Sequence, residues 1–282
     1  MYLLTCVYWC LRATGPSGCG KTSLLDILAN RKKQSVNLSG WTCFTDADST
    51  DNGLFFNYVP QEDSLLGSFT VTETLQYAQA LGPKHAAAAE DAAAEIGNVI
   101  SLLGLDVCKD TKVGDIFSKG ISGGQKRRLS LAVALLSGPK GLLLDEPTSG
   151  LDSASALGVL RALCGIATTY DIPIVATIHQ PSSEMWNLFT KVCLLSMGQM
   201  VYFGPSDKSM AHFAYHGHLC PQFSNPADYF LSLINQVRVR IMPHPMPCQE
   251  AVFPSLSTET DPRFSPHSYS HLHLHPYPHT HT

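Results

Sequence analysis

The fold is decided by the stretch Gly15-Pro16-Ser17-Gly18-Cys19-Gly20-Lys21-Thr22, which matches the pattern G-x-x-x-x-G-K-[ST]. An apolar run precedes it, and the apolar spacing of residues 23–31 predicts a helix after it. In such a loop the backbone N–H groups converge on an anion, and the helix N-terminus adds a partial positive charge. The alternative is an ordinary glycine-rich turn before a helix.

The sequence therefore predicts that this loop holds the phosphates of a nucleotide. Lys21 is expected to reach the β- and γ-phosphates, and Thr22 is expected to offer its hydroxyl to Mg²⁺. The expected nucleotide contacts in this stretch are Gly15, Pro16, Ser17, Gly18, Cys19, Gly20, Lys21, Thr22 and Ser23.

A second stretch supplies the carboxylates that such a loop needs. Residues 142–144 are three leucines and predict a strand buried on both faces, and Asp145 and Glu146 follow where it ends. We expect Asp145 in the Mg²⁺ shell, directly or through a water, and Glu146 as the general base that polarises the attacking water. The alternative, a pair of surface acids in a turn, is disfavoured by the apolar strand before them.

Two further candidates lie near the same expected edge. Residues 172–178 predict a strand that ends at His179, and the ends of strands in an open parallel sheet share the edge where ligands bind. A lone histidine is more often structural, but this one falls beside the expected γ-phosphate. Gln61 is expected to sense Mg²⁺ or the attacking water and to report the nucleotide state to the helices that follow it.

The chain as a whole predicts an α/β fold. Short apolar runs alternate with stretches of helical spacing, which favours a mainly parallel sheet. A short turn at residues 196–199 predicts a hairpin and hence an antiparallel edge. Residues 72–108 are alanine-rich with helical spacing, which indicates a helical insertion. We expect a nucleotide-binding domain over 1–236, with its helical subdomain over 62–125.

Residues 237–282 differ in composition from the rest of the chain. They are rich in proline and histidine and poor in long apolar side chains, so we expect this tail to be disordered. The alternating His271, His273 and His275 could hold a transition metal, and a solvated low-complexity tail is the alternative.

Composition excludes several classes of protein. With 282 residues, 44% of them hydrophobic, the chain has enough apolar side chains for a core. A net charge of -4 excludes the strongly basic surface of a nucleic-acid-binding domain. No run of about 18 apolar residues predicts a membrane span. Nine scattered cysteines without a C-x2-C pair favour reduced thiols in a cytosolic protein over zinc ligands or disulfides.

A third stretch predicts a second phosphate surface. Residues 122–125 open a predicted helix whose first turn contains Lys126, Arg127 and Arg128. Exposed cations there are unfavourable by about 0.3–1 kcal/mol each, and we expect a docking anion to reverse that penalty. Because residues 15–22 already hold the phosphates of one nucleotide, a second phosphate surface on the same chain would grip a different nucleotide. This implies two copies of the domain that face each other head to tail.

The order of these motifs resembles the nucleotide-binding domain of ATP-binding cassette (ABC) transporters. The resemblance pairs residues 15–22 with the Walker A motif, Gln61 with the Q-loop, residues 122–125 with the signature, residues 142–146 with Walker B, residues 149–152 with the D-loop and His179 with the switch histidine. Finer similarities to the G subfamily, the white-type half transporters, lie in residues 145–153, 178–184, 201–204 and 225–230.

The resemblance implies a P-loop NTPase fold with ATP and Mg²⁺ as ligands. It implies catalytic roles for Glu146, His179 and Gln61, and Mg²⁺ contacts from Thr22, Gln61 and Asp145. Nucleotide contacts across a dimer are implied for Ser122, Gly123, Gly124, Gln125 and Asp152.

The same resemblance implies a function and its partners. ATP hydrolysis would power the export of lipids, sterols or other hydrophobic compounds through a membrane domain that this chain lacks. The implied partners are a second nucleotide-binding domain, in a homo- or heterodimer, and the transmembrane domain of a half transporter, with no nucleic acid. We expect membrane association on the cytoplasmic face within a transporter, and a soluble cytoplasmic chain on its own.

Both ends of the chain depart from the family pattern, and this predicts a truncated or alternative product. Fourteen residues precede Gly15, and Tyr2 and Tyr8 are the candidates to stack on adenine. Gln125 stands where the subfamily usually has Glu. The alternative function is therefore a catalytically impaired regulatory or decoy subunit that dimerises with full-length transporters. A soluble P-loop kinase is disfavoured by residues 122–125 and by His179.

Overall fold

A computed structural model describes residues 11–14, 20–31, 56–82, 89–115, 117–179, 181–196, 199–222 and 224–236. Three groups of sequence predictions lie outside the described residues: the loop residues 15–19, the adenine candidates Tyr2 and Tyr8, and the tail 237–282 with its histidines.

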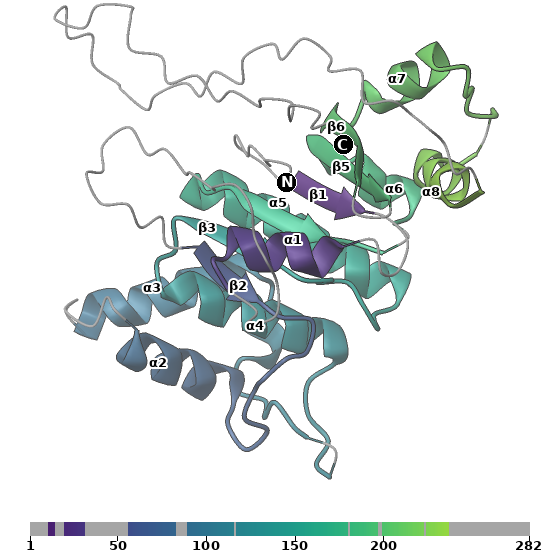
Figure 1. The fold of residues 1–282 in the computed structure, drawn as a ribbon. Helices are drawn as coiled ribbons and strands as arrows, with labels where there is room; N and C mark the ends of the chain where they lie inside the picture. The colour runs from purple at the N-terminus through teal and green to yellow at the C-terminus, as the bar shows by residue number, and fades with distance from the viewer. Residues whose placement is uncertain are drawn as a thin grey trace, which may run out of the picture. The chain divides into compact units, whose positions relative to one another are not determined.

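Six strands of the described residues form a sheet in the order β2-β3-β4-β1-β5-β6 (Figure 1). They are β1 (Leu11–Thr14), β2 (Phe56–Val59), β3 (Gly141–Leu144), β4 (Ile174–Thr177), β5 (Lys191–Ser196) and β6 (Gln199–Pro205). The first five run parallel to one another, and β6 pairs with β5 in the antiparallel direction. The predicted parallel sheet with an antiparallel edge is confirmed.

The helices fall into two groups along the chain. Those that connect strands of the sheet or follow it are α1 (Lys21–Leu28), α5 (Ser153–Tyr170), α6 (Ser183–Trp186), α7 (Ser209–Tyr215) and α8 (Pro226–Gln236). Between β2 and β3 the chain forms α2 (Val71–Leu81), α3 (Ala89–Leu102), the 3₁₀ turn η1 (Asp106–Cys108) and α4 (Gly123–Leu136). The predicted helical insertion is therefore present. Over the described residues, no helix combines the length and apolar character needed to cross a membrane.

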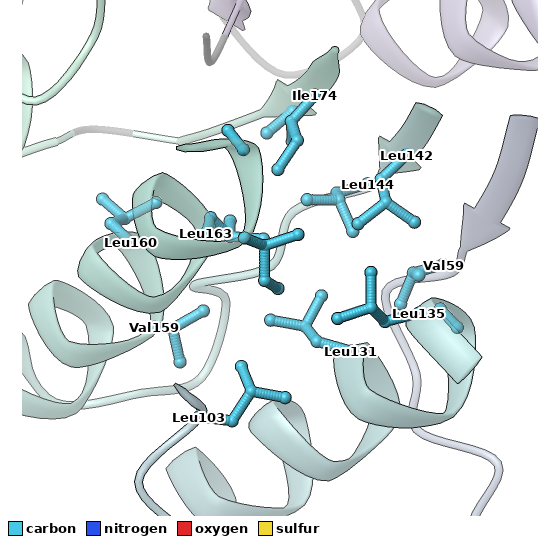
Figure 2. Packing of buried hydrophobic residues seen from close by; sticks show 14 of the residues in the cluster. Val59, Leu103, Leu131, Leu135, Leu142, Leu144, Val159, Leu160, Leu163 and Ile174 are labelled. Carbon is cyan, nitrogen blue, oxygen red and sulfur yellow. The ribbon is translucent and has the colours of Figure 1, made fainter. Parts of the chain in front are cut away.

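The central strands are buried on both faces, as the run of leucines predicts. Leu142 and Leu144 of β3 belong to the large core, where Figure 2 shows them with Leu131 of α4 and Leu163 of α5. Leu143, between them, belongs to a smaller core that includes two leucines of α1. Because successive side chains of a strand point to opposite faces, the sheet has α4 and α5 on one side and α1 on the other.

Strand β2 was not predicted from the sequence. It contains Asn57 and Tyr58, which are partly buried, and its four residues give no clear apolar run. Its identity as a strand comes from pairing, since Phe56 lies opposite Gly141 and Val59 opposite Leu144 of β3. The consequence is that Gln61, two residues further on, also follows the end of a parallel strand.

Leu163→Ala tests the large core. The Leu163 side chain is fully buried, so we expect the substitution to lower the free energy of unfolding by about 3 kcal/mol through lost burial and a residual cavity. Leu81→Ala is the matched control, because Leu81 is also helical but 77% exposed, and it should cost less than about 0.5 kcal/mol. Urea denaturation followed by circular dichroism measures both, and equal losses would contradict this description of the core.

Candidate functional site

The carboxyl ends of four parallel strands lie level with one another. Val59 of β2 pairs with Leu144 of β3, and Leu144 pairs with Ala176 of β4. On the other side of β4, Ala13 of β1 pairs with Thr177. The residues that follow these strands therefore emerge at one edge of the sheet, which is where parallel α/β proteins bind ligands.

The strand β1 leads toward α1, whose start contains the described part of the glycine-rich stretch. Gly20 has a φ of 100° and is the residue before the first turn of α1. This left-handed conformation favours glycine, which agrees with the second glycine of the pattern G-x-x-x-x-G-K-[ST]. Lys21 is 6% exposed, whereas Thr22 and Ser23 are exposed at the helix N-terminus. Among the described residues no side chain caps α1.

Asp145 and Glu146 directly follow β3, and Asp145 is held by two hydroxyl groups. Its Oδ1 accepts a hydrogen bond from Thr177 Oγ1 at 2.6 Å, and its Oδ2 accepts one from Tyr58 OH at 3.2 Å. Burial, and next the Asp145 carboxylate, hold the pKa of Tyr58 well above its ordinary value. The Tyr58 hydroxyl therefore keeps its proton and remains a donor to Asp145.

Glu146 adopts an unusual backbone conformation, with a φ of 45°. A left-handed conformation costs a residue with a side chain about 1–2 kcal/mol. Its backbone N–H donates to Thr177 Oγ1 at 2.8 Å, which helps to stabilise this conformation. The backbone therefore turns sharply between the two acids, so that consecutive carboxylates have different surroundings.

Gln61 reaches the second of these acids from the loop after β2. Its Nε2 donates to Glu146 Oε2 at 3.3 Å and to Ser149 Oγ at 3.2 Å. The structure thus brings together two predicted site residues that are far apart in the sequence. His179 follows β4 at the same edge, and its side chain is exposed. The roles of Gln61, Glu146 and His179 in a reaction stay predictions.

The signature stretch forms the N-terminal end of α4. Ser122 Oγ accepts from the Gln125 N–H at 3.3 Å, and Gln125 Oε1 accepts from the Ser122 N–H at 2.8 Å, which is a capping box. Gly124 is buried against α5, and a Cβ added to it would come 3.0 Å from Ser155 Cβ. Glycine suits this position because the two helices approach each other closely, and a larger residue would displace the Ser155 side chain.

Asp152 caps the neighbouring helix α5. Its Oδ1 accepts from the Ala154 N–H at 3.1 Å and the Ser155 N–H at 3.0 Å. Hydrogen bonds from Ser155, first from its hydroxyl and then from its N–H, lower the pKa of the Asp152 carboxyl. Since Gly124 and Ser155 touch, the signature and Asp152 belong to one surface formed by the starts of α4 and α5.

The three cations that follow the signature donate hydrogen bonds to groups of the protein itself, which the sequence did not predict. Lys126 Nζ donates to the Gly114 carbonyl at 2.9 Å, and an Arg128 guanidinium nitrogen donates to the Leu103 carbonyl at 2.9 Å. Arg127 is 3% exposed and points into the protein. Long side chains reach back to carbonyl groups of the chain, and this offsets the unfavourable helix dipole.

Arg127 joins three segments of the site, and sequence reasoning missed it. One terminal nitrogen of its guanidinium donates to the Pro60 carbonyl at 2.6 Å and to Asp63 Oδ1 at 3.0 Å. The other donates to the Asp145 carbonyl at 3.0 Å. The helix α4, the loop of Gln61 and the end of β3 are therefore connected through one buried side chain. An acid two residues after Gln61 was the only signal in the sequence.

The oxygen atoms at this edge suit Mg²⁺. Asp145 offers a carboxylate whose two oxygens are already oriented by hydroxyl donors, and Thr22 offers an exposed hydroxyl. Across the described residues, no group of three or more His, Cys, Asp or Glu side chains could hold a metal. One carboxylate and one hydroxyl fit Mg²⁺ because this ion relies on waters and substrate phosphates for its other ligands.

Comparisons with known proteins agree with this geometry. A family model described as "ABC transporter" matches residues 10–149, and one described as "ABC-2 type transporter" matches residues 179–249. ABC transporter G family member 1 of Dictyostelium discoideum is 43% identical over 227 residues, which cover 78% of this chain and 28% of that protein. The chain belongs to the G family of ABC transporters.

Other relatives of this ABC transporter chain lie in plants and animals. ABC transporter G family member 11 of Arabidopsis thaliana is 42% identical over 78% of this chain and 31% of that protein. The broad substrate specificity ATP-binding cassette transporter ABCG2 of Rattus norvegicus is 40% identical over 78% of this chain and 34% of that protein. The chain thus spans about a third of the length of these relatives.

A solved structure shares the fold. It is cbiO1 from Clostridium perfringens, described as part of the ABC transporter complex cbiONQ. It matches with a TM-score of 0.58 over 72% of this chain and 79% of that chain, at 20% sequence identity. This likeness confirms the predicted P-loop NTPase fold.

Arg127→Met tests the connection between α4 and the sheet edge. The substitution keeps most of the apolar stem but leaves Asp63, which is 21% exposed, without its cation. We expect it to lower the free energy of unfolding by about 3 kcal/mol, the low end for breaking a buried ion pair. Lys126→Met, on the adjacent residue, should cost about 1 kcal/mol because it loses one hydrogen bond.

A double-mutant cycle with Asp63→Asn separates the pair from other losses. Arg127→Met and Asp63→Asn together should cost less than the sum of the two single changes, because they share one interaction. Chemical denaturation supplies the four values. If the losses in the free energy of unfolding were strictly additive, the Arg127–Asp63 pair would not stabilise the connection between α4 and the sheet edge.

Proposed function

We propose that this chain provides the nucleotide-binding and ATP-hydrolysing domain of a G-type ABC half transporter. The observation that supports this function best is the hydrogen bond between Gln61 and Glu146. It lies at the edge of the sheet where β1 also ends and where Asp145 follows β3. Nucleotide hydrolysis requires an amide that orients water, a base and a group that binds phosphate, and in this proposal Gln61, Glu146 and Lys21 supply them.

Hydrolysis is divided among these residues. The backbone of the glycine-rich loop and the Lys21 ammonium bind the triphosphate. Thr22 and Asp145 would hold Mg²⁺, which when bound neutralises charge on the phosphates.

Glu146, oriented by Gln61, takes a proton from water, and the water oxygen bonds to the γ-phosphorus. The bond from that phosphorus to the β–γ bridging oxygen breaks, so that ADP and phosphate leave. His179 donates a hydrogen bond to the γ-phosphate.

A second nucleotide-binding domain completes the site in this proposal. At the start of α4, the Ser122 hydroxyl and the N–H groups of Gly123 and Gly124 would contact the γ-phosphate bound by the partner's loop. The surface shared by Gly124, Ser155 and the Asp152 cap supports a docking face there. ATP favours the closed pair because the γ-phosphate gains donors from both domains, and hydrolysis removes that bridge.

Transport requires a membrane domain joined to this one. We propose that the partner is the transmembrane domain of a half transporter, and that the protein acts at the cytoplasmic face of a membrane. The relatives, which are about two to three times as long as this chain, support such an arrangement. The proposed cargo is a lipid, sterol or other hydrophobic compound.

Glu146→Gln tests the reaction. The amide cannot take a proton from water, so we expect kcat for ATP to fall about 100-fold or more while ATP binding is retained. ATP should then prolong the lifetime of the dimer. Phosphate release and sedimentation velocity in Mg·ATP measure the two effects.

Glu95→Gln is the matched control, because Glu95 lies on α3 and accepts a hydrogen bond from Gln79 that Gln can replace. Its turnover should equal that of the wild type. Unchanged turnover in Glu146→Gln would show that Glu146 is not the base, and absence of turnover in the wild type would refute the proposed activity.

A further inference from the structure

We propose that Thr177 is a positioning residue that sets the geometry of both acids, Asp145 and Glu146, through its single hydroxyl. This role rests on the proposed function, since it concerns the same site. Thr177 would act through these acids and would not itself touch the nucleotide.

The hydroxyl of Thr177 acts as both a hydrogen-bond donor and a hydrogen-bond acceptor. It donates to Asp145 Oδ1 at 2.6 Å and accepts from the Glu146 N–H at 2.8 Å. Thr177 is fully buried at the end of β4, between β3 and β1. A continuous chain of hydrogen bonds therefore runs from the Glu146 backbone through Thr177 to the Asp145 carboxylate, and each bond in such a chain polarises the next.

Each of these bonds orients a different acid. The bond to Asp145 fixes the plane of a carboxylate whose other oxygen accepts from Tyr58. The bond from Glu146 stabilises a backbone with a φ of 45°, which few residues with a side chain adopt. That backbone directs the Glu146 side chain toward Gln61. One hydroxyl thus links the expected Mg²⁺ ligand to the expected base.

The position of Thr177 within β4 argues for this role. Ile174, Val175 and Ala176 are apolar and buried in the two cores. Thr177 is the polar residue of the strand, and it stands where β4 meets the functional edge. Valine has nearly the same shape as threonine but lacks the hydroxyl, so replacing Thr177 by valine removes these two hydrogen bonds and little else.

The test compares Thr177→Val, which removes the hydroxyl, with Thr177→Ser, which keeps it, in the full 282-residue chain. We expect Thr177→Val to lower kcat for ATP about 10–100-fold with KM within twofold, as is typical when the partner of a ligand is lost. Thr177→Ser should recover kcat to within about threefold. Thr168→Val, which removes an exposed hydroxyl on α5, is the matched control with wild-type turnover.

A second measurement does not depend on turnover. Binding of a fluorescent ATP analogue is titrated without Mg²⁺ and then with increasing Mg²⁺. Thr177→Val should leave the Kd without Mg²⁺ within twofold of the wild type, and should raise the half-saturating Mg²⁺ concentration about tenfold. Should Thr177→Val fail to fold, Thr177→Ala, which also lacks the hydroxyl, replaces it with the same expected losses.

Two results would overturn the proposal: wild-type kcat and Mg²⁺ dependence in Thr177→Val, or a Thr177→Ser variant as impaired as Thr177→Val. A wild type that binds nucleotide without turnover would instead refute the proposed hydrolysis. The Mg²⁺ titration would then decide the role of Thr177 by the same comparison.

Discussion

The level ends of β2, β3, β4 and β1 are the constraint on which the rest of the structure depends. Because these strands end in register, residues from four distant parts of the sequence emerge at one edge. The register is fixed by burial on both faces, since a slip of one residue would turn Leu142 and Leu144 away from α4 and α5. Packing in the interior therefore determines the geometry of the polar groups at the edge.

Two buried polar side chains convert that edge into a connected site. Arg127 ties α4, part of the helical insertion, to the loop of Gln61 and to the end of β3. Thr177 ties the two acids to each other within the sheet. Hydrogen bonds thus connect the groups at this edge to one another and to α4, the helix that would meet a partner domain in the proposed function.

Sequence patterns predicted the features that are encoded locally. The glycine-rich stretch, the leucines before Asp145 and the hairpin near residues 196–199 each lie within a few neighbouring residues, and they led to the right fold. Strand β2 was missed because its pairing with β3 is what makes it a strand. Arg127 was misread because cations in a first helical turn are normally exposed, and its partner Asp63 is remote in the sequence. Thr177 gains its role only through the register of β4 with β3.

Isothermal titration calorimetry with a non-hydrolysable ATP analogue tests the central claim most directly. The claim is that this sheet edge is a Mg·nucleotide site. It predicts saturable binding of about one nucleotide per chain in the presence of Mg²⁺. Lys21→Met should abolish this binding, because methionine lacks the ammonium group with which the buried Lys21 would contact the phosphates. The absence of saturable binding by the wild type, or equal binding by Lys21→Met, would contradict it.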